Sequence, residues 1–260
     1  RMYLSCTQPQ HAQDCTFREL VDIQFVAAMG PPGGGRNPVT PRYIRHFNLV
    51  WMTDYSPASL ERIFQTVFQW HFNKDKFPGE CTSLCNQVVA STIQVFNNIA
   101  RELLPTPSKS HYTFNLRDFA RVVQGVLLSH VDNFEKGTDM ILLWSHELLR
   151  VFYDRLVDGD DRSWFLDQMK VLTQTHFNMD MDVLFKEFDM NCSGGVDDDD
   201  VRYLLYSSYT DPKASKKAYK RIRDLEEMQK TMVGYLEDYN QISSKPMKLV
   251  LFLFAVEHVC

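Results

Sequence analysis

A segment rich in glycine and proline, MGPPGGGRNPVTP at 29–41, constrains the fold of this chain more than any other feature. Proline fixes φ and removes a backbone donor, and glycine weakens both helices and strands, so no regular element can cross this segment. It separates two apolar runs, 21–28 and 47–53, each short enough to be a buried strand. We therefore expect a strand, a loop, a short helix over PRYIRHFN and a second strand, which together make only part of an α/β core.

After this segment the spacing of apolar residues becomes helical. Ser56 followed by Pro57 is typical of a helix start, because serine caps the free backbone N–H groups and proline suits the first helical position. Asn115 predicts the cap of a further helix over 116–129. We expect the other helices at 86–104, 140–156, 163–177, 218–239 and 247–259. The expected fold class is mainly α, with a partial α/β core.

Composition excludes several classes of partner. With 44% hydrophobic and 23% charged residues, the chain has the make-up of a globular protein. Its net charge of −5 argues against nucleic acid as a partner. The most apolar run, 249–256, is far shorter than the ~20 residues that cross a membrane, and RMYLSCTQPQ lacks the apolar core of a secretory signal. We expect an intracellular protein with no membrane partner. Because LVLFLFAVEHVC ends in a helical pattern without a stop signal, we also expect a piece of a longer chain.

The glycine-rich loop does not have the pattern of a phosphate-binding loop. Gly30 and Gly35 have the Walker A spacing, but Arg36 and Asn37 stand where that motif needs lysine and a hydroxyl residue. Pro38 follows at the point where a helix should begin, so no helix N-terminus is directed at a phosphate. No apolar run ending in paired acids supplies a Walker B carboxylate. We therefore assign no catalytic residue and expect no ATP hydrolysis by this chain alone.

The acidic segment DMNCSGGVDDDD has the length and spacing of an EF-hand calcium loop. Such a loop supplies oxygen ligands from positions 1, 3, 5, 7, 9 and 12, with glycine at position 6 where the chain turns sharply. Gly194 occupies position 6, and apolar residues at helical spacing flank the loop on both sides. The ligand positions here are Asp189, Asn191, Ser193, Gly195 (through its carbonyl), Asp197 and Asp200.

Two features weaken this interpretation. Position 12 is Asp200 rather than the longer glutamate, which lowers affinity or shifts preference from Ca²⁺ toward Mg²⁺. EF-hands also usually work in pairs, and no second loop is present. The alternative is a solvated acidic linker, for which a run of four aspartates is typical. We expect Ca²⁺, or Mg²⁺, as the only cofactor of the chain itself.

Four segments in succession are similar to one family. They are VDIQFVAAMGPPGGGRNPVTPRYIRHFNLVWM, HYTFNLRDFARVVQGVLL, LWSHELLRVFYDRLVDGDDRSWF and YLEDYNQISSKPMKLVLFLFAVEHV. The first resembles the fourth and fifth strands, with their connecting loop, of the third AAA+ module in axonemal dynein heavy chains. The next two resemble the helical lid of that module, and the last resembles the start of the fourth module. Members of the inner-arm type are the most similar.

The resemblance implies roles for three arginines. Arg117 matches the sensor-II arginine of the lid, which reaches the terminal phosphate of nucleotide held by the same module. Arg42 or Arg45 lies where an arginine finger faces the neighbouring module. The alternative for each is a solvated charge on a helix. The resemblance also implies that the Walker A and Walker B strands lie before Arg1, so ATP or ADP would bind only in the intact parent. Met29 and Gly30 depart from the polar residue that is usual at the sensor-I place.

Together these observations predict four regions: 1–54, a partial AAA+ α/β core; 55–178, the helical lid; 179–208, an EF-hand-like helix-loop-helix; and 209–260, a linker and the first helices of the next module. By resemblance the parent is an ATP-driven, minus-end-directed microtubule motor of cilia, located in the cytoskeleton of the axoneme. Its partners would be the rest of the dynein ring, neighbouring AAA+ modules and other dynein subunits, with microtubules reached only through a stalk outside this chain. The alternatives are a stand-alone, non-motor calcium sensor or adaptor, and a purely structural piece with a degenerate loop.

Overall fold

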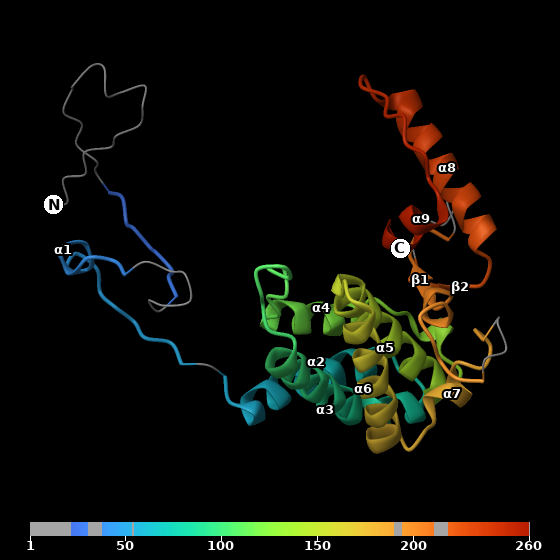
Figure 1. The fold of residues 1–260 in the computed structure, drawn as a ribbon, viewed down its shortest axis with the longest axis horizontal. Helices are drawn as coiled ribbons and strands as arrows, with labels where there is room; N and C mark the ends of the chain where they lie inside the picture. Colours follow the sequence, from blue (N-terminus) through green and yellow to red (C-terminus); the bar gives the residue numbers. More distant parts are fainter. Residues whose placement is uncertain (1–21, 31–37, 54, 190–193, 211–217, 260) are drawn as a thin grey trace. The chain divides into compact units, whose positions relative to one another are not determined.

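The computed structural model describes residues 22–30, 38–53, 55–189, 194–210 and 218–259. The chain divides into two compact units, Arg1–Asp54 and Tyr55–Cys260 (Figure 1). In the first unit the described residues contain one short helix, α1 (Pro41–Ile44), and no strand.

The prediction of two strands in the first unit was wrong for its described residues. Residues 22–28 and 47–53 have no regular structure, and their apolar side chains are exposed apart from the half-buried Phe47, with Val26 at 90% and Met52 at 86%. A strand is stable only when a neighbouring strand satisfies its backbone groups. Two short apolar runs that do not pair with each other cannot form a sheet, so residues 22–30 and 38–53 do not contain the expected part of an α/β core.

The second unit is helical, as the sequence predicts. Its elements are α2 (Pro57–Lys74), α3 (Gly79–Glu102), α4 (Leu116–Leu127), η1 (Val131–Asn133), α5 (Gly137–Val151), η2 (Tyr153–Arg155), α6 (Gly159–Phe177), α7 (Met181–Leu184), η3 (Asp200–Arg202), β1 (Leu205–Ser207), β2 (Lys220–Ile222), α8 (Leu225–Ile242) and α9 (Leu253–Val259). The predicted start of α2 is confirmed, since Ser56 accepts a hydrogen bond from the Ser59 N–H and Pro57 begins the helix.

Helix α5 is the centre of the bundle that α2 to α6 form (Figure 1). Every residue from Met140 to Leu149 is buried, including three polar ones. The Trp144 indole N–H donates to the Thr92 hydroxyl of α3 at 2.8 Å, so the largest side chain of the core also satisfies its one polar atom. Each fully buried large apolar side chain contributes roughly 1.5–3 kcal/mol, which fixes α5 against α3 and α4.

Two short strands interrupt the helical pattern beyond the bundle. β1 and β2 pair antiparallel, with Leu205 opposite Ile222 and Ser207 opposite Lys220. The prediction of a helix over 218–239 was therefore wrong at its start, because Asp224 caps α8 and the preceding residues pair as β2. All three residues of β1 are buried, so no alternation marked it in the sequence. Leu205, Ile222, Met228, Met232 and Val256 form a second small core there.

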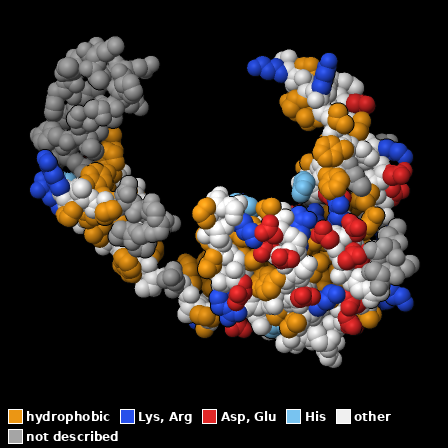
Figure 2. Space-filling view, in the orientation of Figure 1, with side chains coloured by type: hydrophobic (Ala, Val, Ile, Leu, Met, Phe, Trp, Pro, Cys, Tyr) orange, Lys and Arg blue, Asp and Glu red, His pale blue; other side chains and the backbone are white. Residues whose placement is uncertain are grey.

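The surface of the second unit is of mixed charge. On the face drawn in Figure 2, its acidic and basic side chains are interspersed with apolar ones. Among the described residues, no helix is long and apolar enough to cross a membrane.

Candidate functional site

The N-terminus of α4 is fixed by its own side chains. Asn115 Oδ1 accepts a hydrogen bond from the Arg117 N–H at 2.8 Å, and Asp118 Oδ2 accepts one from the Asn115 N–H at 3.0 Å. These bonds form a capping box, which satisfies backbone donors that the first helical turn leaves free. The predicted cap at Asn115 is confirmed. The turn that carries Arg117 consequently has a defined position.

Arg155 of η2 holds the same turn from the other side. Its guanidinium lies 3.2 Å from Asp118 Oδ2, donates to the His111 carbonyl at 2.7 Å and covers the Phe114 ring at 4.6 Å. Asp118 is only 4% exposed, so its charge needs a close partner. Arg121, on the outer side of α4, approaches Asp118 Oδ1 more loosely, at 3.6 Å. Arg155 therefore fixes the segment that leads into α4.

Sequence reasoning did not find the Arg155 contact. The spacing of Asn115 and Asp118 is a capping-box pattern that marks the acid as structural. No sequence pattern links either residue to Arg155, because the two segments are brought together by α5, which packs against both α4 and η2.

Arg117 lies exposed on this turn. Its side chain makes no hydrogen bond or ion pair with any residue that the structure describes. A cation is disfavoured in the first turn of a helix, where the helix dipole is positive and attracts anions instead. An arginine held at this end, beside Asp118 whose charge Arg155 already balances, is suited to binding an anionic group from outside the helical bundle.

The other two arginines named from the sequence lie in the first unit. Arg42 is in α1, and Arg45 follows it directly. Both are exposed, and Arg45 Nε donates to His46 Nε2 at 3.2 Å. Both belong to the first unit, whereas Arg117 belongs to the second.

The acidic loop is closed by hydrogen bonds to its own backbone. Asp189 Oδ2 accepts from the Gly194 N–H at 3.0 Å, and Gly194 has a φ of +78°, as a sharp turn at position 6 requires. Asp197 Oδ1 accepts from the N–H groups of Asp199 and Asp200, and Asp200 Oδ2 accepts from the Asp197 N–H. Asp200 is 1% exposed, and its Oδ1 has no hydrogen-bond partner among the residues that the structure describes. Burial raises the pKa of Asp200, and the Asp197 and Asp189 charges raise it further.

The two long flanking helices expected of an EF-hand are not observed. The incoming helix, α7, has four residues, and the outgoing segment is the three-residue η3 followed by strand β1. Asp182 of α7 joins the loop to α6, accepting from the Val196 N–H at 2.8 Å and from Lys170 Nζ at 3.1 Å. These tertiary contacts stabilise short elements around the loop, although the spacing of the apolar residues there is helical.

Only part of the predicted ligand set can be placed. Asn191 and Ser193 lie outside the described residues, whereas Asp189, Gly195, Asp197 and Asp200 lie within them. Within 22–30, 38–53, 55–189, 194–210 and 218–259, no group of three His, Cys, Asp or Glu side chains is arranged to hold a metal ion.

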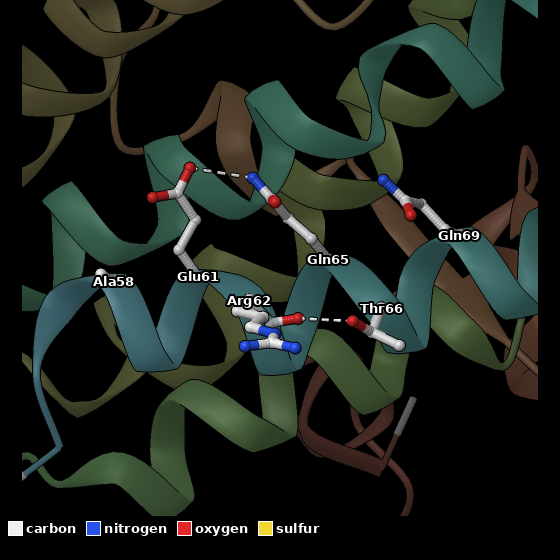
Figure 3. A pocket seen from close by; sticks show the side chains of 6 residues that line it. All are labelled: Ala58, Glu61, Arg62, Gln65, Thr66 and Gln69. Carbon is white, nitrogen blue, oxygen red and sulfur yellow. Dashed lines mark hydrogen bonds between the residues drawn. The ribbon is translucent and has the colours of Figure 1, made fainter.

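A surface hollow of about 300 Å³ runs along α2 (Figure 3). All of its lining residues belong to one face of that helix: Ala58, Glu61, Arg62, Gln65, Thr66 and Gln69. A groove lined by one helix surrounds no ligand, and none of the predicted site residues borders it.

Comparison with known proteins links both units to one kind of molecule. Residues 88–186 match the AAA+ lid domain family, and residues 1–55 match the P-loop containing dynein motor region. Dynein axonemal heavy chain 12 of Mus musculus is 39% identical over 261 residues, which cover 100% of this chain and 8% of that protein. The chain is homologous to axonemal dynein heavy chains. Dynein axonemal heavy chain 3 of Homo sapiens is 41% identical over 95% of this chain and 6% of its own length, and heavy chain 1 of Homo sapiens is 39% identical over 94% and 6%.

The chain spans less than a tenth of the length of these relatives. The lid match contains α4, Arg117, Asp118 and Arg155, while the motor-region match ends where the first unit ends. The name of the motor-region family mentions a P-loop, but Arg36 and Asn37 stand in this chain where that motif has lysine and a hydroxyl residue.

Proposed function

We propose that this chain is the lid-bearing segment of the third AAA+ module of an inner-arm type axonemal dynein heavy chain, and that Arg117 senses nucleotide bound in that module. The parent would be an ATP-driven, minus-end-directed motor in the axoneme of cilia. Its partners would be the remaining ring modules and dynein subunits, and it would reach microtubules through its stalk. This segment would have a regulatory role in the motor and would not itself hydrolyse nucleotide.

The nucleotide role is supported by one observation: Arg117 is exposed, whereas the turn that bears it is held in place. The turn is held by the capping box and by Arg155, while Arg117 itself is exposed without a described partner. A guanidinium grips phosphate oxygens as a rigid fork, so fixing the turn restricts where that fork can reach. Arg42 and Arg45 remain our candidates for an arginine finger that acts on the neighbouring module.

The test is Arg117→Ala in a full-length heavy chain that carries this segment. A hydrogen bond to a charged group contributes about 1.5–3 kcal/mol, so we expect ATP affinity at this module to fall roughly tenfold or more. Arg121→Ala is the matched control, because it removes the same charge one turn later on the same helix. Unchanged ATP affinity in the Arg117 variant would remove the assignment, as would an equal loss in the control.

A second candidate function is binding of Ca²⁺ or Mg²⁺ by the loop from Asp189 to Asp200. It is favoured by the buried Asp200 Oδ1 atom, which has no partner within the described part of the chain, since a buried unsatisfied oxygen costs about 1–3 kcal/mol and a cation would relieve this. Asp189, Asn191, Ser193, the Gly195 carbonyl, Asp197 and Asp200 would supply oxygens. A stand-alone calcium sensor derived from a dynein gene remains the alternative if such binding exposes apolar surface.

A calorimetric titration with Ca²⁺, with magnesium at about 1 mM present, tests this candidate. We expect saturable binding that is lost in the Asp189→Ala, Asp200→Ala double variant. Asp199→Ala is the control, because Asp199 stands at the non-ligating position 11 of the loop. The same heat from all three proteins, or no heat from any, would leave the loop as an acidic linker.

A further inference from the structure

Three polar side chains meet inside the second unit where α5 faces the residues that lead into β2. His146 and Glu147 of α5 are 0% and 6% exposed. His146 Nδ1 lies 2.9 Å from the Leu204 carbonyl oxygen, and Nε2 lies 3.2 Å from the Tyr219 hydroxyl. The same hydroxyl lies 2.6 Å from Glu147 Oε1. The contacts form one chain from Leu204 through His146 and Tyr219 to Glu147.

The Leu204 carbonyl, at one end of this series of contacts, determines where the hydrogens of the series lie. A carbonyl oxygen can only accept, so His146 Nδ1 carries a hydrogen, and Nε2 of the neutral ring is an acceptor. Tyr219 has one hydrogen to donate. If it donates to a Glu147 carboxylate, Nε2 faces an oxygen with no proton between them. With all three side chains neutral, every contact is a hydrogen bond only when Glu147 is protonated. Glu147 then donates to Tyr219, and Tyr219 donates to His146.

The surroundings favour this neutral arrangement. Burial raises the pKa of Glu147 to about 7, although the Tyr219 hydrogen bond and the charge of Arg150 oppose the shift. Burial lowers the pKa of His146 to about 3, and Arg150 lowers it as well. Arg150 is itself paired with Asp154 at 3.1 Å. Helix α4 presents Gly125, without a side chain, to the Glu147 carboxyl, and β1 adds Tyr206, next to the His146 ring.

We propose that His146, Tyr219 and Glu147 form a latch that holds one proton and ties the residues before β2 to α5, and that loss of this proton loosens the tie. Tyr219 is also joined to the end of α4 and to η1, since it bridges to Ser129 and its carbonyl accepts from Asn133 Nδ2 at 2.6 Å. The chain continues from Tyr219 directly into β2 and α8. The latch thus controls how the lid is joined to α8, independently of nucleotide sensing by Arg117.

The direction of the pH effect follows from linkage. The folded-state pKa of Glu147, about 7, is above the ordinary glutamate value of 4.5, so the folded state binds the proton more tightly than the unfolded state. The contribution of Glu147 to stability is therefore complete below pH 4.5 and is lost as pH rises through about 7. His146 acts in the opposite direction, losing stability as pH falls below 6.5. A comparison between variants is needed to separate the effect of Glu147 on the pH dependence of stability from that of His146.

Glu147→Gln in the 260-residue chain makes that separation. The glutamine amide donates to Tyr219 as the protonated acid does, but it does not titrate. Between about pH 4.5 and pH 8, we expect the folding equilibrium constant of the unsubstituted protein to fall by on the order of a hundredfold more than that of the variant. Glu237→Gln, at an exposed position of α8, should follow the unsubstituted protein. Parallel pH profiles for Glu147→Gln and the unsubstituted protein would overturn the proposal.

A measurement on the unsubstituted protein keeps the proposal testable if the variant does not fold. Nitrogen NMR distinguishes the two neutral histidine tautomers. We expect His146 near neutral pH to be neutral, with its proton on Nδ1, and a protonated carboxyl that titrates at about pH 7 in infrared spectra. A proton on Nε2, a charged imidazolium or a Glu147 carboxylate well below that pH would each contradict the latch.

Discussion

At the scale of single residues, two arginines near one aspartate have different roles. Arg155 and Arg121 both approach Asp118, but Arg155 also bonds the His111 carbonyl and covers Phe114. An exposed, long ion pair such as that of Arg121 contributes at most about 1 kcal/mol. A partner of a buried carboxylate contributes more, because its removal leaves a charge without compensation.

We therefore predict that Arg155→Ala lowers the free energy of unfolding by about 2 kcal/mol, whereas Arg121→Ala changes it by less than about 0.5 kcal/mol. Denaturant unfolding of the two variants at neutral pH measures the difference. Equal effects would show that Arg155 has no special part in fixing the N-terminus of α4.

At the scale of elements, α4 and α5 approach closely at Gly125. A Cβ atom at Gly125 would overlap with Glu147 Oε2, so a larger residue would displace the Glu147 carboxyl from Tyr219. Gly234 is also helical, in α8, but a Cβ atom there would meet nothing within 4 Å. Alanine at Gly234 therefore tests helix propensity alone, whereas alanine at Gly125 tests helix propensity together with packing.

We predict opposite effects of alanine at these two glycines. Gly234→Ala should raise the free energy of unfolding by up to about 1 kcal/mol, the usual gain of alanine over glycine within a helix. Gly125→Ala should lower it by about 1–3 kcal/mol, because the clash exceeds that gain. Thermal unfolding of both variants is the measurement, and stabilisation by Gly125→Ala would contradict the described packing.

Helix starts could be predicted from the sequence because their causes are local. Ser56 and Asn115 cap helices with their own side chains, so residue type and position carry the information. β1, β2 and the Arg155 contact could not be predicted, since each depends on residues distant in the chain. In the acidic loop, the turn at Gly194 is local and was predictable from its glycine. The short flanking elements depend on tertiary contacts of Asp182 that no spacing reveals.

At the scale of the whole molecule, the chain consists of two units of very different kinds. None of the described residues in 22–30 and 38–53 is buried, whereas the second unit contains a core of large apolar side chains centred on α5. Burial of apolar surface is the main source of folding free energy. The second unit therefore accounts for nearly all of the stability of the chain.

We accordingly predict that the chain without residues 1–54 keeps the midpoint of thermal unfolding within roughly 2 °C of that of the full chain. Circular dichroism of the two proteins at equal concentration measures this. A drop of more than about 5 °C would show that the first unit contributes to the core.

The central claim is that Arg117 reaches the terminal phosphate of a nucleotide held by its own module. The most direct measurement compares ATP with ADP binding at this module in full-length heavy chains with and without Arg117→Ala. If the guanidinium contacts the terminal phosphate, the substitution weakens ATP binding by about tenfold, corresponding to about 1.4 kcal/mol, and leaves ADP binding nearly unchanged. An equal loss for both nucleotides, or no loss for either, would contradict the claim.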